Sequence, residues 1–139
     1  MSVKNLFSLS LLLLVLFGLS CNTIKKINLF SIQDDKNLGL QVSKEIENDR
    51  NQFPLLAERG NEEVYRYIRN ITNNILNSGK VQHKNDFDWQ VKIIDDPETL
   101  NAFATPGGYI YVYTGLIKFL DTEDQLAGVM GHEIAHADR

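Results

Sequence analysis

The residues with the clearest capacity for chemistry lie near the C-terminal end of the sequence. His132-Glu133-Ile134-Ala135-His136 fits the pattern H-E-x-x-H. On a helix, residues four apart differ by about 40° in azimuth and roughly 6 Å in height, so the two imidazoles can converge on one metal ion. Glu133 then lies about 100° from His132 and about 60° from His136, beside the ion rather than bound to it. There its carboxylate can take a proton from a water that zinc has made acidic, so the pattern predicts a hydrolytic Zn2+ site.

The helix that would carry this motif is predicted from signals that do not involve the histidines. Thr122 can cap its N-terminus, and Gln125 three residues later completes a capping box. Two of the three histidines of the chain fall in the motif, and we expect the third, His83, to be solvent-exposed in a polar loop. The alternative is a chance match, since two helical histidines can also be surface residues or hydrogen-bonding residues of a core.

The elements that must position this helix follow from hydrophobic periodicity. Apolar residues at three- and four-residue steps favour helices, and strict alternation favours a half-buried strand. The fold class is therefore α+β, with helices packed on a small sheet. The predicted elements are helices over 36–50 and 62–77, a strand over 87–95, an extended piece over 101–105, a turn at 106–108, a strand over 109–114, a helical turn over 115–120 and the motif helix from 122.

The same patterns predict which side chains face the core. In the helix 36–50 the apolar positions are Leu38, Leu40, Val42 and Ile46. In the helix 62–77 they form one stripe: Val64, Tyr67, Ile68, Ile71, Ile75 and Leu76. Tyr65 lies off that stripe, so we expect it on the solvated face together with Arg66, Arg69 and Asn73. The tyrosines at 109, 111 and 113 share one face of their strand and are predicted to pack rather than to do chemistry.

The first twenty residues have the composition of a secretory signal peptide. Lys4 precedes the apolar run 6–19, which is shorter than the roughly 20 residues that span a bilayer. Cys21, the single cysteine, follows the small residue Ser20, and this arrangement resembles a bacterial lipoprotein signal. We therefore expect residues 1–20 to be removed, residues 21–35 to form a tether, and lipid on Cys21 to anchor the protein to a membrane of the bacterial cell envelope, the outer one, facing the periplasm. A plain cleaved signal and an uncleaved anchor are the alternatives.

Composition excludes several classes of protein. The formal net charge is −4 and no basic block is present, which argues against nucleic acid as a partner. A single cysteine cannot close an intramolecular disulfide, so the chain is not a disulfide-stapled scaffold.

Several ordered motifs resemble one known family. Asn101-Ala102-Phe103-Ala104, Pro106-Gly107-Gly108, Gly115-Leu116, Gln125-Leu126-Ala127 and Gly131-His132-Glu133-Ile134-Ala135-His136 occur in that order. Together they look like the HtpX- and Oma-type zinc metallopeptidases, which form metallopeptidase family forty-eight with the CAAX prenyl proteases. The resemblance is dense over residues 101–139 and looser over 36–95.

This resemblance implies a zinc-dependent endopeptidase. By it, His132 and His136 are ligands of one Zn2+ ion and Glu133 is the general base. Asn101, Ala102, Phe103 and Ala104 would pair with an extended polypeptide substrate by strand addition. The family's third ligand is a glutamate on a later helix. Only Ala137, Asp138 and Arg139 follow His136, and Asp138 is placed to point away from the ion.

We therefore expect residues 36–139 to be the amino-terminal part of an incomplete, zincin-like catalytic domain. The resemblance implies hydrolysis of peptide bonds in misfolded or unassembled envelope proteins, a quality-control activity. The 139-residue chain alone is expected to bind zinc weakly and to be inactive, because two imidazoles fall short of the three protein ligands typical of catalytic zinc. The alternative is a protein without catalysis, either an inactive truncated lipoprotein or a peptide-binding module.

Overall fold

The computed structural model describes residues 31–138. The expected signal peptide and Cys21 lie outside these residues. No helix within them is both long and apolar enough to cross a membrane. Their elements are α2 (Ile32–Asn48), α3 (Glu62–Leu76), β1 (Gln90–Ile94), β2 (Ala102–Thr105), the 3-10 turn η1 (Pro106–Gly108), β3 (Tyr109–Tyr113), α4 (Thr114–Phe119) and α5 (Glu123–Ala137).

The three strands form one mixed sheet with β3 in the centre. β1 runs parallel to β3, with Gln90 opposite Tyr109, and β2 runs antiparallel to it, with Ala102 opposite Val112. The chain therefore enters the sheet at one edge, moves to the other edge, and returns through η1 to the centre. As a result, β1 and β2 are the two outer strands of this sheet.

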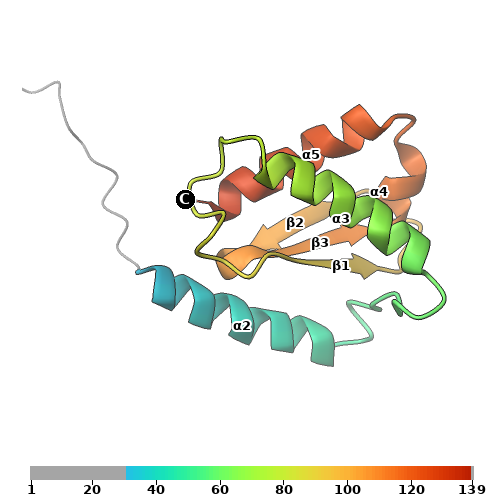
Figure 1. The fold of residues 1–139 in the computed structure, drawn as a ribbon. Helices are drawn as coiled ribbons and strands as arrows, with labels where there is room; N and C mark the ends of the chain where they lie inside the picture. The colour runs from blue at the N-terminus through green and yellow to red at the C-terminus, as the bar shows by residue number, and fades with distance from the viewer. Residues whose placement is uncertain (1–30, 139) are drawn as a thin grey trace, which may run out of the picture.

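Helices cover both faces of the sheet. Figure 1 shows α3 and α5 side by side over one face, while α2 runs along the opposite face. Strand residues alternate between the two layers, as the period of a β-strand requires. Val91 and Ile93 pack toward α3 and α5, whereas Ile94 packs toward α2. The sheet is thus the middle layer of a three-layer arrangement.

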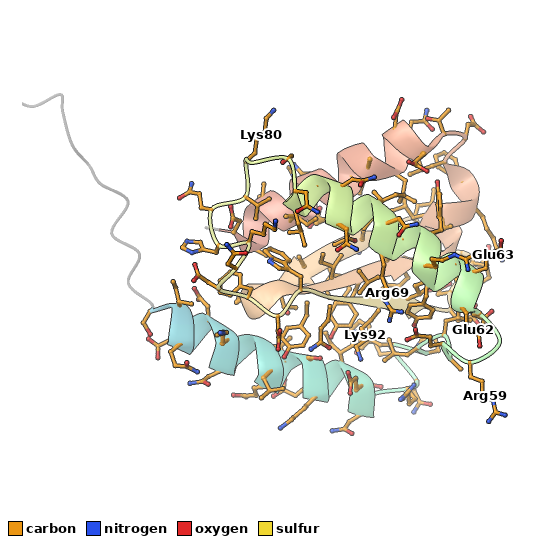
Figure 2. All side chains as sticks on the ribbon, viewed as in Figure 1. Arg59, Glu62, Glu63, Arg69, Lys80 and Lys92 are labelled. Carbon is orange, nitrogen blue, oxygen red and sulfur yellow. The ribbon has the colours of Figure 1, made fainter. Side chains whose placement is uncertain are left out.

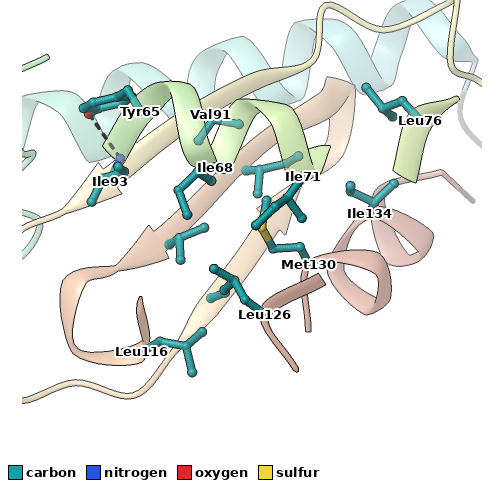
Figure 3. Packing of buried hydrophobic residues seen from close by; sticks show 13 residues of the cluster. Tyr65, Ile68, Ile71, Leu76, Val91, Ile93, Leu116, Leu126, Met130 and Ile134 are labelled. Carbon is teal, nitrogen blue, oxygen red and sulfur yellow. Dashed lines mark hydrogen bonds between the residues drawn. The ribbon is translucent and has the colours of Figure 1, made fainter. Parts of the chain in front are cut away.

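The larger core lies between the sheet and the helices α3 and α5 (Figure 3). Ile68 of α3, Met130 of α5 and Ile110 of β3 are completely buried there. Burying an aliphatic side chain of this size stabilises a fold by roughly 1.5–3 kcal/mol, so this cluster is the main attachment of α5 to the rest of the chain.

The smaller core, facing α2, is aromatic. The rings of Phe103 and Tyr111 stack with centroids 4.8 Å apart, and Phe53 meets Phe103 edge-on at 6.3 Å. Tyr109, Tyr111 and Tyr113 are all buried in this cluster, in agreement with their predicted packing role.

The predicted elements are found, with three differences at their boundaries and faces. α2 begins at Ile32 rather than at residue 36, because the Ser31 hydroxyl and the Asp34 carboxylate form a capping box. The last residues of the expected tether therefore belong to this helix. The strand predicted from residue 87 begins only at Gln90, because the backbone N–H of Phe87 turns back to donate to the His83 carbonyl.

The third difference concerns the faces of α2 and α3. Leu38 and Leu40 are nearly half exposed, and the residues of α2 that are buried are Gly39, Ser43 and Ile46. Tyr65, expected in solvent, is only 4% exposed, whereas Tyr67 is 37% exposed. The Tyr65 hydroxyl donates to the Leu56 carbonyl at 2.8 Å and accepts from the Ile93 N–H at 3.3 Å, so the sheet edge draws this ring inward.

Candidate metal centre and substrate edge

The helix α5 holds the H-E-x-x-H residues in fixed positions. The Thr122 hydroxyl accepts a hydrogen bond from the Gln125 N–H, and the Gln125 side chain accepts one from Thr122, which is the predicted capping box. Leu126, Met130 and Ile134 are buried against the sheet and α3. Because these residues fix the rotation of the helix, His132 and His136 lie on its exposed side.

The two histidines point at one another. Nε2 of His132 and Nε2 of His136 are 2.9 Å apart, and the ring planes are nearly perpendicular at 86°. At this distance one imidazole donates a hydrogen bond to the other, whose nitrogen must carry a lone pair. Two nitrogen donors therefore converge on one point above the helix, as the spacing of four residues predicts.

This pair fits part of a zinc site. Two Zn–N bonds of about 2.0–2.1 Å in a tetrahedron place the nitrogens roughly 3.3 Å apart, so the rings need to separate by only about 0.4 Å. Imidazole nitrogen is also a donor that suits zinc. Within residues 31–138, however, no group of three or more His, Cys, Asp or Glu side chains is placed to hold an ion. His132 and His136 are therefore a candidate pair of ligands within the described residues.

Glu133 is half-buried on the same helix, next to the first histidine. No hydrogen bond or ion pair engages its carboxylate within residues 31–138. A carboxylate without a competing partner is available to accept a proton, which is the property a general base requires.

Of the residues expected to meet substrate, two present main-chain groups at the open edge of the sheet. The Tyr113 N–H donates to the Asn101 carbonyl at 3.1 Å, so Asn101 and, by alternation, Phe103 direct their main-chain groups toward β3. Ala102 and Ala104 direct theirs away from it. Their side chains pack in the core that holds α5, so this edge lies beside the histidine helix.

The remaining two residues have different surroundings. The Phe103 ring belongs to the aromatic core on the α2 side, where it stacks on Tyr111. Asn101 is exposed. The structure therefore brings Ala102 and Ala104, but not the Phe103 ring, to the side of the sheet where the histidines lie.

A carboxylate just beyond the motif has a structural role that spacing alone does not reveal. Asp138 is 8% exposed and accepts the N–H groups of Gln82 at 2.7 Å and His83 at 2.6 Å. It points away from the histidine pair, as expected, and ties the C-terminus of α5 to the loop 81–87. His83 is only partly exposed, because its Nδ1 lies 2.9 Å from Asp86 Oδ2 and its ring packs near Phe87.

Sequence comparisons identify relatives of this chain. The mitochondrial metalloendopeptidase OMA1 of Schizosaccharomyces pombe is 37% identical over 70 residues, covering 50% of this chain and 20% of the relative. The human metalloendopeptidase OMA1 is 41% identical over 49 residues, covering 35% and 9%. The beta-barrel assembly-enhancing protease of Escherichia coli is 46% identical over 39 residues, covering 28% and 8%. The chain thus spans a fifth or less of each of these relatives.

These relatives contradict the predicted location. The relatives that match larger shares of the chain are named as mitochondrial proteins of eukaryotes, and the bacterial relatives match shorter stretches. The expectation of a lipid-anchored protein of the bacterial envelope, facing the periplasm, is therefore wrong. It rested on one short apolar run followed by a cysteine.

The family resemblance itself is confirmed. The model of Peptidase family M48 matches residues 62–139, a stretch that contains α3, the sheet and the histidine helix. This match covers more than half of the chain, and the relatives are named metalloendopeptidases or proteases. The chain therefore belongs to peptidase family M48.

Proposed function

We propose that this chain supplies the histidine pair, the general base and the substrate edge of a zinc endopeptidase. The observation that carries the proposal is the convergence of the His132 and His136 Nε2 atoms on a helix that packs beside the open edge of β2. When bound, zinc would polarise a carbonyl and acidify a water. M48 metallopeptidases are zinc-dependent, which agrees with this donor set.

The substrate in this proposal is an extended polypeptide. Ala102 and Ala104 each offer one N–H and one C=O at the outer edge of β2, and an antiparallel strand of three residues or more can pair with both. Their small side chains leave room for the backbone of a substrate to approach α5. Main-chain pairing is independent of side-chain identity, so it suits a protease that must accept many sequences.

Glu133 would act as the proton acceptor. The free carboxylate would take a proton from the attacking water and later return it to the leaving amine, so the peptide bond breaks without net consumption of acid or base. Ala102, Ala104 and Glu133 thus have separate functions: the alanines hold the substrate and the glutamate moves the proton.

A third ligand is required to complete the site. Because the relatives are at least five times longer than the matched region, we propose that their additional sequence includes the residue that completes the ligand set. The 139-residue chain by itself should bind zinc weakly and should not cleave casein. A peptide-binding module without catalysis is the second candidate, favoured by the two-ligand set of the described residues.

Zinc titration of the 139-residue chain by calorimetry tests the ligand assignment. His132→Ala and His136→Ala should each weaken binding by at least about tenfold, while Glu133→Gln should bind as wild type. His83→Ala is the matched control, because His83 is the third histidine of the chain and should not affect binding. Equal weakening by His83→Ala, or none by the motif variants, would contradict the assignment.

The proposed proteolytic activity is tested by a different measurement. Casein cleavage that is robust, sensitive to chelator and abolished by Glu133→Gln in the 139-residue chain would show that the two-ligand set suffices, against our expectation. For the module alternative, binding of an extended peptide that persists in His132→Ala and in chelator would favour peptide binding without catalysis.

A further inference from the structure

A second open strand edge lies on the opposite side of the sheet from β2. A groove of about 540 Å³ runs beside β1 between α2 and α3. Its lining includes Trp89, Gln90 and Val91 at β1, and Tyr65 and Arg69 of α3. Nothing in the proposed proteolytic site uses these residues, so the groove needs its own explanation.

The outer edge of β1 already accepts an extended segment of the chain over half of its length. The Leu56 N–H donates to the Ile93 carbonyl at 2.8 Å, and the Asp95 N–H donates to the Pro54 carbonyl at 2.7 Å. Leu55 forms an antiparallel bridge with Ile94 between them. This edge is therefore competent to pair with an antiparallel strand.

This antiparallel pairing covers Ile93, Ile94 and Asp95 but does not reach Val91. In a parallel pair of strands, every second residue directs both its N–H and its C=O to the same side. The main-chain groups of Val91 therefore point away from β3, as those of Ile93 do. Within residues 31–138 neither its N–H nor its C=O has a hydrogen-bond partner. A donor and an acceptor of the backbone thus face the groove, where they are available to pair with another strand.

An ion pair holds the chain away from this position. After Leu56 the chain leaves the edge, and both carboxylate oxygens of Glu58 receive hydrogen bonds from the Arg69 guanidinium, one of them at 2.8 Å. The Arg69 guanidinium also lies over the Tyr65 ring, 5.1 Å from its centroid. The hydrogen bonds from Arg69 lower the pKa of Glu58, so this carboxylate stays ionised to a lower pH than an unpaired glutamate. The ion pair thus ties the loop after Leu56 to α3 at the rim of the groove.

The charges around the groove favour an acidic occupant. Three cationic residues line the groove, Arg50, Arg69 and Lys92, but only two carboxylates, Glu47 and Glu58. The groove therefore has a positive balance of charge, although the net charge of the chain is −4. Figure 2 shows Arg69 and Lys92 together between α2 and α3, with Arg59 and Lys80 projecting elsewhere. Lys92 pairs with Glu47 at 3.0 Å, whereas exposed Arg50 has no ion-pair partner within residues 31–138.

We propose that this groove binds an extended, acidic segment of another polypeptide, which adds to β1 as an antiparallel strand at Val91 and places a carboxylate on Arg50. The chain's own residues 1–30 are a poorer occupant, since they contain three lysines and no acidic residue. A second copy would bring the same positive balance to the same edge. The site lies across β1, β3 and β2 from the proposed cleavage site, so it holds a polypeptide without cutting it.

Trp89 gives a direct probe of binding, because it is the single tryptophan of the chain and lines the groove. The full chain is titrated with a capped hexapeptide of alternating valine and glutamate, and with a matched hexapeptide of valine and lysine. The acidic peptide should change the tryptophan emission with saturation, and the basic peptide should not. A saturable response to both peptides, or to neither, would overturn the proposal.

Two variants test the contacts. Val91→Pro removes the outward N–H without removing a hydrogen bond to β3, and it should weaken binding by about tenfold. Arg50→Glu should weaken binding by at least about fivefold and should leave the fold unchanged, since Arg50 is exposed. Arg59→Glu is the matched control, because it makes the same charge change outside the groove and should have a smaller effect. Equal affinities across these variants would refute the proposal.

Two further outcomes would assign the groove to another occupant and overturn the proposal. If deletion of residues 1–30 creates peptide binding that the full chain lacks, the groove belongs to the chain's own N-terminal segment. If the tryptophan emission changes on dilution together with the sedimentation coefficient, it belongs to a second copy.

Discussion

Replacing Gly39 with alanine should destabilise the fold, because α2 touches the backbone of η1 at this residue. A Cβ atom at position 39 would lie 1.8 Å from the Pro106 carbonyl oxygen and 2.8 Å from its carbon. An ordinary contact is about 3.4 Å, so the two backbones must separate by roughly 1.5 Å. Neither side of the contact is a flexible side chain, so the whole helix or the whole turn has to move.

The size of the effect follows from two opposing terms. Overpacking of this severity costs about 3 kcal/mol, at the upper end of the usual range. Alanine in place of glycine in a helix returns about 1 kcal/mol. The free energy of unfolding should therefore fall by about 2 kcal/mol, and Tm by roughly 8–16 °C for a domain of this size.

Urea denaturation followed by far-UV circular dichroism measures this loss. Gly128→Ala is the matched control, because Gly128 is an exposed residue of α5 and no atom lies within 4 Å of its added Cβ. That variant should gain roughly 0.5–1 kcal/mol from helix propensity alone. If Gly39→Ala unfolds within about 0.5 kcal/mol of wild type, or if both variants lose stability equally, the close contact between α2 and η1 is refuted.

Two other predictions concern stability. Asp138→Ala should lower the free energy of unfolding by about 3 kcal/mol in urea denaturation, because two partly buried N–H groups lose a charged acceptor. Exposed Asp124→Ala should lower it by less than about 1 kcal/mol, and equal losses would contradict the anchoring role of Asp138. Burial raises the pKa of the hydroxyls of three tyrosines that are at most 8% exposed, so the unfolded chain releases these protons first and stability should fall as the pH rises above about 10. Urea midpoints between pH 7 and pH 11 measure this loss, and phenolate absorbance should rise together with unfolding; full ionisation of all five tyrosines in the folded chain would contradict it. The three tyrosines are Tyr65, Tyr111 and Tyr113.

Local signals predicted the part of the molecule that carries the histidines. The capping box at Thr122 and the apolar residues of α5 are close in sequence, and they determine both where the helix begins and which side of it is exposed. The convergence of His132 and His136 then follows from helix geometry alone. For this reason the motif could be placed without knowledge of the remaining fold.

Contacts between distant residues account for what the sequence patterns missed. Gly39 is buried because it meets Pro106, and no periodicity within α2 reveals a partner so far along the chain. Tyr65 is drawn to the sheet edge by Leu56 and Ile93, which reversed its expected exposure. The outward direction of Ala102 and Val91 depends on strand register, which requires the pairing partners to be known.

The candidate catalytic residues occupy one continuous stretch of chain, from β2 to the end of α5. Roughly thirty residues separate β2 from the histidines. Bringing these two parts together closes a short loop, which costs less chain entropy than closing a longer one. The hairpin of β2 and β3 is closed by η1 and can form in microseconds, and α5 then docks on a surface that is already nearby. Assembly of this centre is therefore expected to be fast. The helix α2 contacts it from much earlier in the chain, so this contact adds stability rather than speed.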